Sequence, residues 1–248
     1  MAVTTPEDSA RWIRRFAPAD DAATRLVCLP HAGGSASFFV PYATALHPRT
    51  DVLAVQYPGR QDRWCDPLID NMSDLADAAT DALRPWLDRP FALFGHSMGA
   101  SLAFEVAGRL TRDGSVPTHL FASGRRAPSC HRDGEHIHLK SDDAIVAELA
   151  AISGTDPSVL AEPELLAMVL PGVRNDFRVA ETYRSTGAPP LTCPITVLIG
   201  DEDPRVSFDE AQAWRAHTTG AFDVRIFPGG HFYLVDNRNG VLEVLSSR

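Results

Sequence analysis

The sequence predicts an α/β fold, in which a mostly parallel sheet is covered by helices on both faces. Strand and helix signals alternate along the 248 residues, which is typical of parallel strands joined by helical crossovers. Helices are expected over 71–87 and 98–112, for example, and Trp12 to Phe16 is a candidate for an additional edge strand. The predicted strands are the apolar stretches 25–30, 51–57, 91–96, 119–124, 195–200 and 222–227.

The strongest local signal is the motif Gly95-His96-Ser97-Met98-Gly99, which stands between a predicted strand and a predicted helix. A serine on so sharp a turn occupies strained backbone space, so its neighbours must lack a β-carbon. Strand, G-x-S-x-G and helix together form the nucleophile elbow of the α/β-hydrolase fold. An ordinary glycine-rich turn is the alternative, and the residues that follow favour the elbow. We therefore predict an α/β-hydrolase fold with Ser97 as the nucleophile.

The acid and the base of a hydrolytic triad are expected later in the chain. In this fold the serine, the acid and the histidine follow one another in that order. His231 lies just past the last predicted strand and is the candidate base that takes the proton from Ser97. Asp201 and Asp203 compete for the role of the acid that orients the imidazole. Asp203 is preferred because this acid usually stands three residues past the glycine that ends the strand. Asp201 is the alternative acid, or it caps the turn.

The loop after the first predicted strand, Pro30 to Ser35, is the candidate for half of an oxyanion hole. Acyl transfer passes through a tetrahedral oxyanion, which backbone N–H groups stabilise. One donor follows the nucleophile and is expected to be the N–H of Met98; the other is expected to be the N–H of Ala32. We interpret His31 as shaping this loop through hydrogen bonds, and His96 as a ring packed beneath the elbow.

A helical insertion interrupts the alternation over about residues 128–188, where helices are expected over 142–152, 162–170 and 173–183. In this fold such an insertion lies over the nucleophile as a lid. We therefore expect a single domain over residues 1–248 with a helical lid subdomain. The apolar lid residues either line an acyl pocket or pack the lid on the core, and packing is favoured for most of Ile145, Leu149, Leu165, Leu166, Met168 and Phe177.

Two groups of polar residues lie in the predicted loops. One is a segment of the insertion whose irregular order shows no metal-ligand spacing, so we predict a solvated loop and no metal site. Its polar residues are His131, Asp133, Glu135, His136 and His138. The other group consists of arginines in loops after strands. Each one alone is expected to be a solvated charge, and as a group they are candidates for a basic patch that meets a phosphate or an acidic surface. These are Arg60, Arg63, Arg125, Arg126 and Arg205.

Composition and charge restrict the class of protein. The formal net charge of −9 argues against binding to nucleic acid. No apolar run approaches the roughly 20 residues needed to span a bilayer, and the polar, acidic stretch Thr4 to Ser9 does not fit a secretory signal. Four widely spaced cysteines suggest free thiols in a reducing compartment. We expect a cytoplasmic monomer that contacts neither nucleic acid nor membrane.

Several motifs together resemble the type II thioesterases, stand-alone enzymes that accompany modular polyketide synthases and nonribosomal peptide synthetases. The similarity covers about residues 11 to 245. Residues 170–177 resemble a family segment of the form leucine-proline-x-x-arginine-x-aspartate-phenylalanine. The other motifs are Pro30-His31-Ala32-Gly33-Gly34, Gln56-Tyr57-Pro58-Gly59-Arg60, the serine motif at 95–99, and Gly229-Gly230-His231-Phe232-Tyr233-Leu234.

The resemblance implies a function. It implies hydrolysis of acyl thioesters on the phosphopantetheine arm of acyl or peptidyl carrier proteins, with removal of stalled or wrongly primed units. The carrier protein is then the partner, and the enzyme needs no cofactor of its own. Two alternatives stay open at this point: a chain-releasing or general acyl thioesterase or esterase, and a non-catalytic carrier-binding protein on a hydrolase scaffold.

Overall fold

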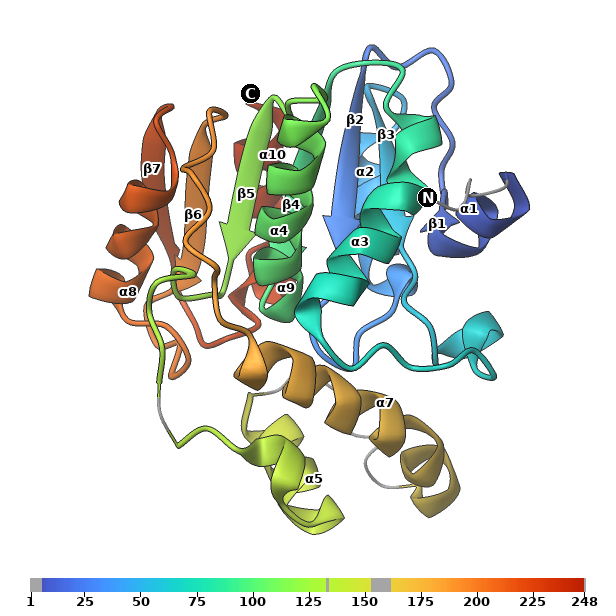
Figure 1. Cartoon of the computed structure of the whole chain (residues 1–248), viewed down its shortest axis with the longest axis vertical. Coiled ribbons are helices and arrows are strands. Elements are labelled where there is room, and N and C mark those ends of the chain that lie inside the picture. The colour runs from blue at the N-terminus through green and yellow to red at the C-terminus, as the bar shows by residue number, and fades with distance from the viewer. Residues whose placement is uncertain (1–5, 133, 153–161, 248) are drawn as a thin grey trace.

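A seven-stranded sheet runs through the centre of the computed structural model, which describes residues 6–132, 134–152 and 162–247 (Figure 1). The strand order is β1-β3-β2-β4-β5-β6-β7, and all neighbouring pairs are parallel except β1 with β3. The six predicted strands are confirmed to within two residues at each end. The strands are β1 (Ile13–Arg14), β2 (Thr24–Leu29), β3 (Thr50–Val55), β4 (Phe91–His96), β5 (His119–Ser123), β6 (Ile195–Gly200) and β7 (Phe222–Phe227).

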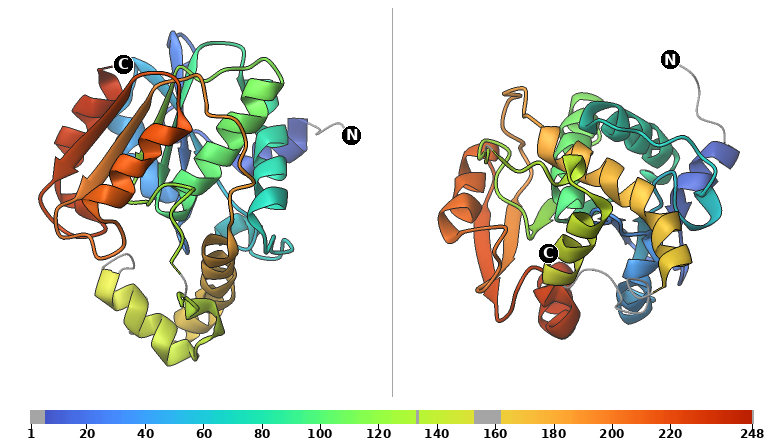
Figure 2. Two further views of the ribbon diagram at one scale, coloured as in Figure 1. Left: turned by 60° about the vertical axis from the view of Figure 1, so that its left-hand side comes forward. Right: turned by 90° about the horizontal axis from the view of Figure 1, so that it is seen from below.

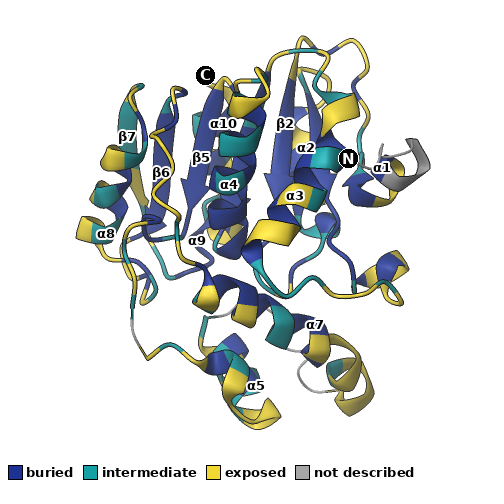
Figure 3. Cartoon of the chain, viewed as in Figure 1, coloured by how far each residue is buried: buried dark blue, intermediate teal, exposed yellow. Residues whose placement is uncertain are grey.

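Helices cover both faces of the sheet, which explains the apolar runs of its central strands, whereas the edge strand β7 carries Asp223 and Arg225 and is only partly buried. In β2, Leu26 and Cys28 point to one face while Val27 and Leu29 point to the other, and all four are buried. The face of Leu26 packs against α2 (Val40–Leu46) and α10 (Arg238–Ser246), and the opposite face packs against α3 (Met72–Leu83) and α4 (Met98–Arg112). Figure 3 shows the buried sheet between these layers.

Local sequence signals set the ends of several helices. Asn71 caps α3, because its side chain accepts a hydrogen bond from the N–H of Asp74 at 2.9 Å. Ser207 and Glu210 form a capping box that begins α8 (Phe208–Gln212). The remaining core helices are α1 (Pro6–Trp12) and α9 (Tyr233–Asp236). Short 3-10 helices are η1 (Ala36–Phe39), η2 (Gln61–Arg63), η3 (Arg84–Trp86), η4 (Ile137–Leu139) and η5 (Ala213–His217).

The edge-strand candidate near the N-terminus is only partly correct. Trp12 is the last residue of α1, so β1 is limited to Ile13 and Arg14, which pair with Val55 and Ala54 of β3. This pairing is antiparallel because the short strand has no helical crossover before β2.

The insertion lies beyond the carboxyl ends of the strands, where α5 (Asp142–Ile152) and α7 (Pro163–Thr182) cross the end of the sheet (Figures 1 and 2). Asp133 and residues 153–161 lie outside the described residues. The prediction of two helices over 162–170 and 173–183 is wrong, because one helix continues through Pro171. Burial of Leu170, Val173 and Phe177 on one face of the helix outweighs the free energy lost with the missing backbone hydrogen bond of Pro171. The buried lid residues that pack together are Ile137, Ile145, Leu149, Leu170, Val173 and Phe177.

Candidate active site

Ser97 stands at a sharp turn between β4 and α4 with a φ of +55°, a conformation that side-chain-bearing residues rarely adopt. The two flanking glycines are required by close backbone contacts. A Cβ on Gly95 would lie 2.1 Å from the carbonyl oxygen of Gly99, and a Cβ on Gly99 would lie 2.1 Å from the carbonyl oxygen of Leu29. The turn is therefore a nucleophile elbow, and its glycines have the steric role that the sequence predicts.

The structure brings Ser97, His231 and Asp203 together at the carboxyl ends of β4, β7 and β6. Ser97 Oγ lies 3.0 Å from His231 Nε2. On the other side of the imidazole, Nδ1 lies 2.9 and 3.1 Å from the two carboxylate oxygens of Asp203. Both the histidine and the aspartate are buried. This is the geometry in which a carboxylate fixes the tautomer of an imidazole that can accept the serine proton.

Asp201 occupies a different position in the same turn. Its carboxylate accepts a hydrogen bond from the N–H of Gly229 at 2.8 Å, and so connects the turn after β6 to the turn that carries His231. Asp203 Oδ1 also accepts the N–H of Arg205 at 2.8 Å, which fixes the carboxylate beside the imidazole. Of the two candidate acids, Asp203 contacts the histidine, and Asp201 caps the turn.

The two candidate oxyanion donors lie on either side of the serine. Met98 is the first residue of α4, where backbone N–H groups have no partner within the helix. In the loop after β2, the N–H of Gly33 donates to Asp176 at 2.7 Å and the N–H of Gly34 donates to the carbonyl of His31 at 2.9 Å. These two donors are engaged, and Ala32 lines the catalytic cavity together with Ser97 and His31.

Two buried histidines lie beside the site. The ring of His31 packs edge-on against Phe38 and Phe232, each at 4.8 Å between ring centroids, and its Nδ1 has no hydrogen-bond partner among the described residues. His31 thus shapes the loop through its carbonyl, which accepts the N–H of Gly34, and through the packing of its ring, whereas Nδ1 makes no hydrogen bond. His96 lies beneath the elbow, with Nδ1 2.9 Å from Ser123 Oγ. Burial lowers the pKa of His31 to about 3 and holds the pKa of His96 well below its ordinary value.

These histidines predict a loss of stability in acid. Below about pH 6.5 the unfolded chain protonates His31, while the folded chain keeps it neutral down to about pH 3. Because the unfolded state then binds more protons, the free energy of unfolding falls as the pH falls, by at most about 1.4 kcal/mol per pH unit for each such group. Urea unfolding measured near pH 7 and near pH 5.5 should show that the free energy of unfolding falls less between these two pH values in His31→Phe than in the wild type. Equal losses would contradict the prediction.

Ser97 and His231 open onto a cavity of about 40 Å³ that lies between core and lid. On the lid side its walls include Ile152 of α5 and Phe177 and Ala180 of α7. The space beside the nucleophile is therefore narrow.

A larger groove of about 610 Å³ lies on the other side of the oxyanion loop, between α7 and the loop after β3. Leu165 and Met168 line it and are 46% and 47% exposed. Ile145, Leu149 and Phe177 are buried, but they pack with one another inside the lid, and Phe177 also lines the catalytic cavity. Leu165 and Met168 instead line the groove, to which Leu149 also contributes. Leu166 is partly buried against the same cluster.

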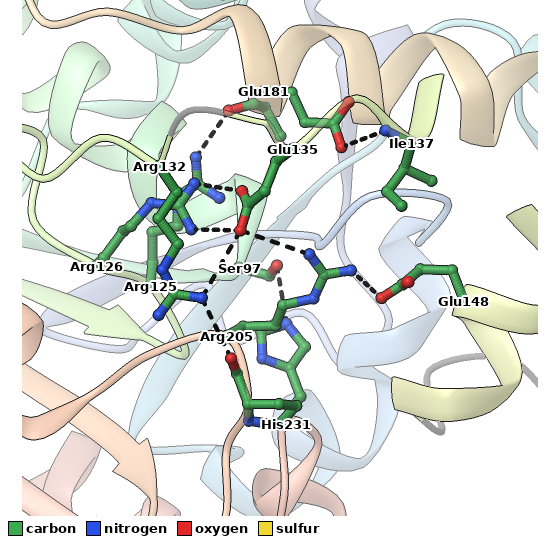
Figure 4. A network of polar contacts seen from close by, with 12 residues as sticks. Ser97, Arg125, Arg126, Arg132, Glu135, Ile137, Glu148, Glu181, Arg205 and His231 are labelled. Atoms are coloured by element: carbon green, nitrogen blue, oxygen red, sulfur yellow. Dashed lines mark hydrogen bonds and ion pairs between the residues drawn. The ribbon is translucent and has the colours of Figure 1, made fainter. Parts of the chain in front are cut away.

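A network of charged side chains connects the lid to the core above the catalytic cavity (Figure 4). Glu135 accepts a hydrogen bond from Arg126 at 2.5 Å and lies 3.7 Å from Arg132 and 3.9 Å from Arg205. Arg205 also pairs with Glu148 of α5. Burial raises the pKa of Glu135, but Arg126 and the neighbouring guanidinium groups outweigh this effect and leave the pKa below its ordinary value. The carboxylate is thus ionised where lid and core meet.

The loop arginines are neither solvated charges nor a free basic patch, because all five are engaged within the protein. Each of these arginines meets a carboxylate or buried oxygens, and so their charges are not available as a free surface patch. Arg125 donates to Ser101 Oγ and to the carbonyl of Ala180. The ion pairs of the others are Arg60 with Asp176, Arg63 with Asp66, Arg126 with Glu135, and Arg205 with Glu148.

The polar segment of the insertion is only partly solvated. His131 and His136 are exposed, whereas Glu135 belongs to the charged network and His138 Nδ1 lies 2.5 Å from the carboxylate of Glu181. Within the described part of the chain, three or more histidine, cysteine or acidic side chains nowhere converge as a metal would require. The described helices also include none with the length and apolar character needed to cross a bilayer.

The parallel sheet, the nucleophile elbow and the array of serine, histidine and aspartate define a serine hydrolase of the α/β-hydrolase class. A family model described as "Thioesterase domain" matches residues 24–248. The chain belongs to the thioesterase family.

Known relatives support the resemblance seen in the motifs. The chain is 49% identical over 240 residues to the "Probable cadicidin biosynthesis thioesterase" of Streptomyces griseus, an alignment that spans 96% of this chain and 66% of that relative. It is 48% identical over 241 residues to the thioesterase PikA5 of Streptomyces venezuelae, covering 96% of this chain and 85% of the relative. Among solved structures, the type II thioesterase BorB from the borrelidin biosynthetic cluster superposes with a TM-score of 0.91 at 50% identity, covering 95% and 96% of the two chains. The predicted resemblance to type II thioesterases is confirmed.

Proposed function

We propose that this protein is an editing thioesterase, which hydrolyses acyl groups from the phosphopantetheine arm of acyl or peptidyl carrier proteins. In this role it removes stalled or wrongly primed units during polyketide or nonribosomal peptide synthesis. The observation that carries the proposal is the array of Ser97, His231 and Asp203, at 3.0 Å and 2.9 Å, in a chain that resembles biosynthetic thioesterases along nearly its whole length.

Acylation begins at Ser97. Its Oγ attacks the thioester carbonyl carbon while His231 Nε2 takes the hydroxyl proton, and the carboxylate of Asp203 stabilises the imidazolium that forms. The carbonyl oxygen becomes an oxyanion that accepts hydrogen bonds from the N–H groups of Ala32 and Met98. The carbon–sulfur bond then breaks, and the phosphopantetheine thiol leaves with the proton from His231.

Deacylation repeats the sequence with water. His231 Nε2 takes a proton from a water molecule, whose oxygen attacks the acyl group on Ser97. The ester bond breaks, the proton returns to Ser97 Oγ, and a free carboxylic acid is released. Every proton transfer uses a side chain of this protein or water. We therefore propose that the enzyme uses no cofactor of its own, since the phosphopantetheine belongs to the substrate.

The size of the catalytic cavity supports a short acyl group as the substrate when the lid lies where the structure places it. The volume of about 40 Å³ corresponds to about three water-sized spheres. Ion pairs from Arg126 and Arg205 to Glu135 and Glu148 hold the lid over this cavity. The proposal is that the lid lies closed here, and that these pairs separate when the long phosphopantetheine arm enters.

The proposed setting is the cytoplasm. The four cysteines are free, and Cys28 and Cys193 are buried, which supports a reducing compartment. One chain supplies the three triad side chains and both oxyanion donors, so the site is complete without a second copy. We therefore propose that the enzyme acts as a monomer.

We expect a higher kcat/KM for one short acyl group on a carrier protein than for the same group on coenzyme A. A carrier docked beside the lid adds contacts that free coenzyme A lacks, and such remote binding energy can position the reacting carbonyl. The net charge of −9 gives no general attraction to an acidic carrier, so the gain must come from local contacts. Side-by-side hydrolysis of propionyl-carrier, propionyl-coenzyme A and propionyl-pantetheine measures it. Equal or faster turnover of the coenzyme A ester would contradict carrier docking and favour a general acyl thioesterase.

A further inference from the structure

A buried ion pair joins the lid to the core directly beside the oxyanion loop. Arg60 follows β3, Asp176 belongs to α7, and their side chains are only 9% and 3% exposed. The carboxylate of Asp176 accepts a hydrogen bond from Arg60 and a second one, at 2.7 Å, from the N–H of Gly33. Arg60 Nε in turn donates to the carbonyl of Gly34 at 2.8 Å. Together the side chains of Arg60 and Asp176 hold both glycines of the loop. Neither side chain has a role in the chemistry proposed above.

We call the pair of Arg60 and Asp176 the clamp. It acts on the residue next to Ala32, whose N–H is the candidate oxyanion donor. The N–H of Gly33 and the carbonyl of Ala32 share one rigid peptide plane, so fixing that N–H also fixes the rotation at Ala32. Gly33 has a φ of +75°, and a Cβ there would lie 2.9 Å from Val173 Cγ2 of α7. The loop is thus pressed against the lid helix and hydrogen-bonded to it. The position of α7 therefore fixes the peptide plane that directly follows the one carrying the N–H of Ala32.

We infer that Arg60 and Asp176 are positioning residues for the oxyanion hole, and that the hole is complete only when α7 is seated on the core. The inference rests on the proposed hydrolysis through Ser97. Because the clamp touches the loop and not the substrate, its loss should act on the transition state more than on substrate binding. The loss of one oxyanion donor lowers kcat by about 10²- to 10³-fold in comparable sites.

The test needs variants that fold. Removing Asp176 alone would leave the charge of Arg60 buried without a partner, which destabilises a protein strongly. The double variant Arg60→Met/Asp176→Leu removes both charges together. A matched control is Arg25→Met/Asp51→Leu, because this pair is also buried, with 3.1 Å between Arg25 Nε and Asp51 Oδ2. It lies at the amino ends of β2 and β3, the end of the sheet opposite to Ser97.

We expect kcat of the clamp variant to fall by about 10²-fold with KM changed less than about threefold, whereas the control keeps kcat within about threefold of the wild type. The rate at which a fluorophosphonate labels Ser97 should fall in parallel, because phosphonylation also builds negative charge on an oxygen in the hole. Arg60→Met/Asp176→Asn retains an oxygen for the N–H of Gly33 and should keep more activity than Arg60→Met/Asp176→Leu. Circular dichroism and thermal unfolding establish that each variant is folded.

Two results would overturn the inference. One is a folded clamp variant with kcat and labelling rate close to those of the wild type. The other is that kcat and the labelling rate fall equally in the clamp variant and in the control variant, which would mean general destabilisation. A failure of the proposed function looks different: the wild type would be labelled at Ser97 but would hydrolyse no acyl thioester. The labelling rates of the variants would still test the clamp in that case.

Discussion

Ser97→Ala is expected to lower kcat for thioester hydrolysis by at least about 10⁴-fold, because Oγ forms the covalent bond and the members of a triad act as a unit. The fold should survive. Alanine retains the Cβ at φ +55°, and the hydrogen bond lost is the one to His231. We expect the free energy of unfolding to change by less than about 1 kcal/mol.

A serine buried away from the site provides the control. Ser9 is 2% exposed and its Oγ donates to the carbonyl of Ala82 at 2.8 Å, between α1 and α3 and away from the site. Hydrolysis of a propionyl-carrier and fluorophosphonate labelling should be abolished in Ser97→Ala and retained in Ser9→Ala. Substantial hydrolysis by Ser97→Ala would remove the proposed nucleophile and, with it, covalent catalysis at this elbow.

The catalytic residues could be predicted because each one depends on short-range sequence. The glycines at 95 and 99 follow from contacts within the elbow itself and with the adjacent β2. The strands could be predicted because a sheet covered on both faces needs continuous apolar stretches, and turn residues bound them. Asp203 and His231 come shortly after the carboxyl ends of two predicted strands. Once the strands were predicted, both residues could therefore be placed at the same edge of the sheet.

The clamp beside the oxyanion loop could not be predicted in this way. Arg60 and Asp176 are 116 residues apart, and nothing near either residue in the sequence shows that the two meet. From the sequence, a loop arginine such as Arg60 is therefore expected to be a solvated charge or part of a basic patch. The only sequence signal was that both residues belong to motifs shared with the type II thioesterases to which no catalytic role was assigned. Motifs of this kind indicate residues that position others.

The lid helix α7 shows a second limit of sequence reasoning. Pro171 and Gly172 are strong local signals for a break between two helices. The helix continues because Leu170, Val173 and Phe177 lie on one face and are buried together with α5. Burial of three large side chains contributes several kcal/mol, about 1.5–3 kcal/mol each, which exceeds or matches the cost of about 3 kcal/mol for an interior proline. The outcome thus depended on tertiary contacts.

The acid of the triad is the choice that sequence spacing leaves least secure, and a pair of matched variants decides it. Asp203→Asn is expected to lower kcat by about 10⁴-fold. The carboxylate lies 2.9 Å from His231 Nδ1, and an amide there removes the charge that stabilises the imidazolium. It can also present an N–H to Nδ1, which favours the tautomer with the proton on Nε2, and that tautomer cannot accept the proton of Ser97.

Asp201→Asn is the control, because it makes the same chemical change two residues away. The asparagine keeps an oxygen for the N–H of Gly229, so the turn should hold and kcat should fall less than about tenfold. Steady-state hydrolysis of a propionyl-carrier by both variants, with thermal unfolding to show that they fold, makes the comparison. A severe loss in Asp201→Asn with a mild one in Asp203→Asn would assign the acid to Asp201 and leave Ser97 and His231 in their roles. Mild losses in both would mean that His231 needs no carboxylate partner, because the buried turn alone then fixes its tautomer.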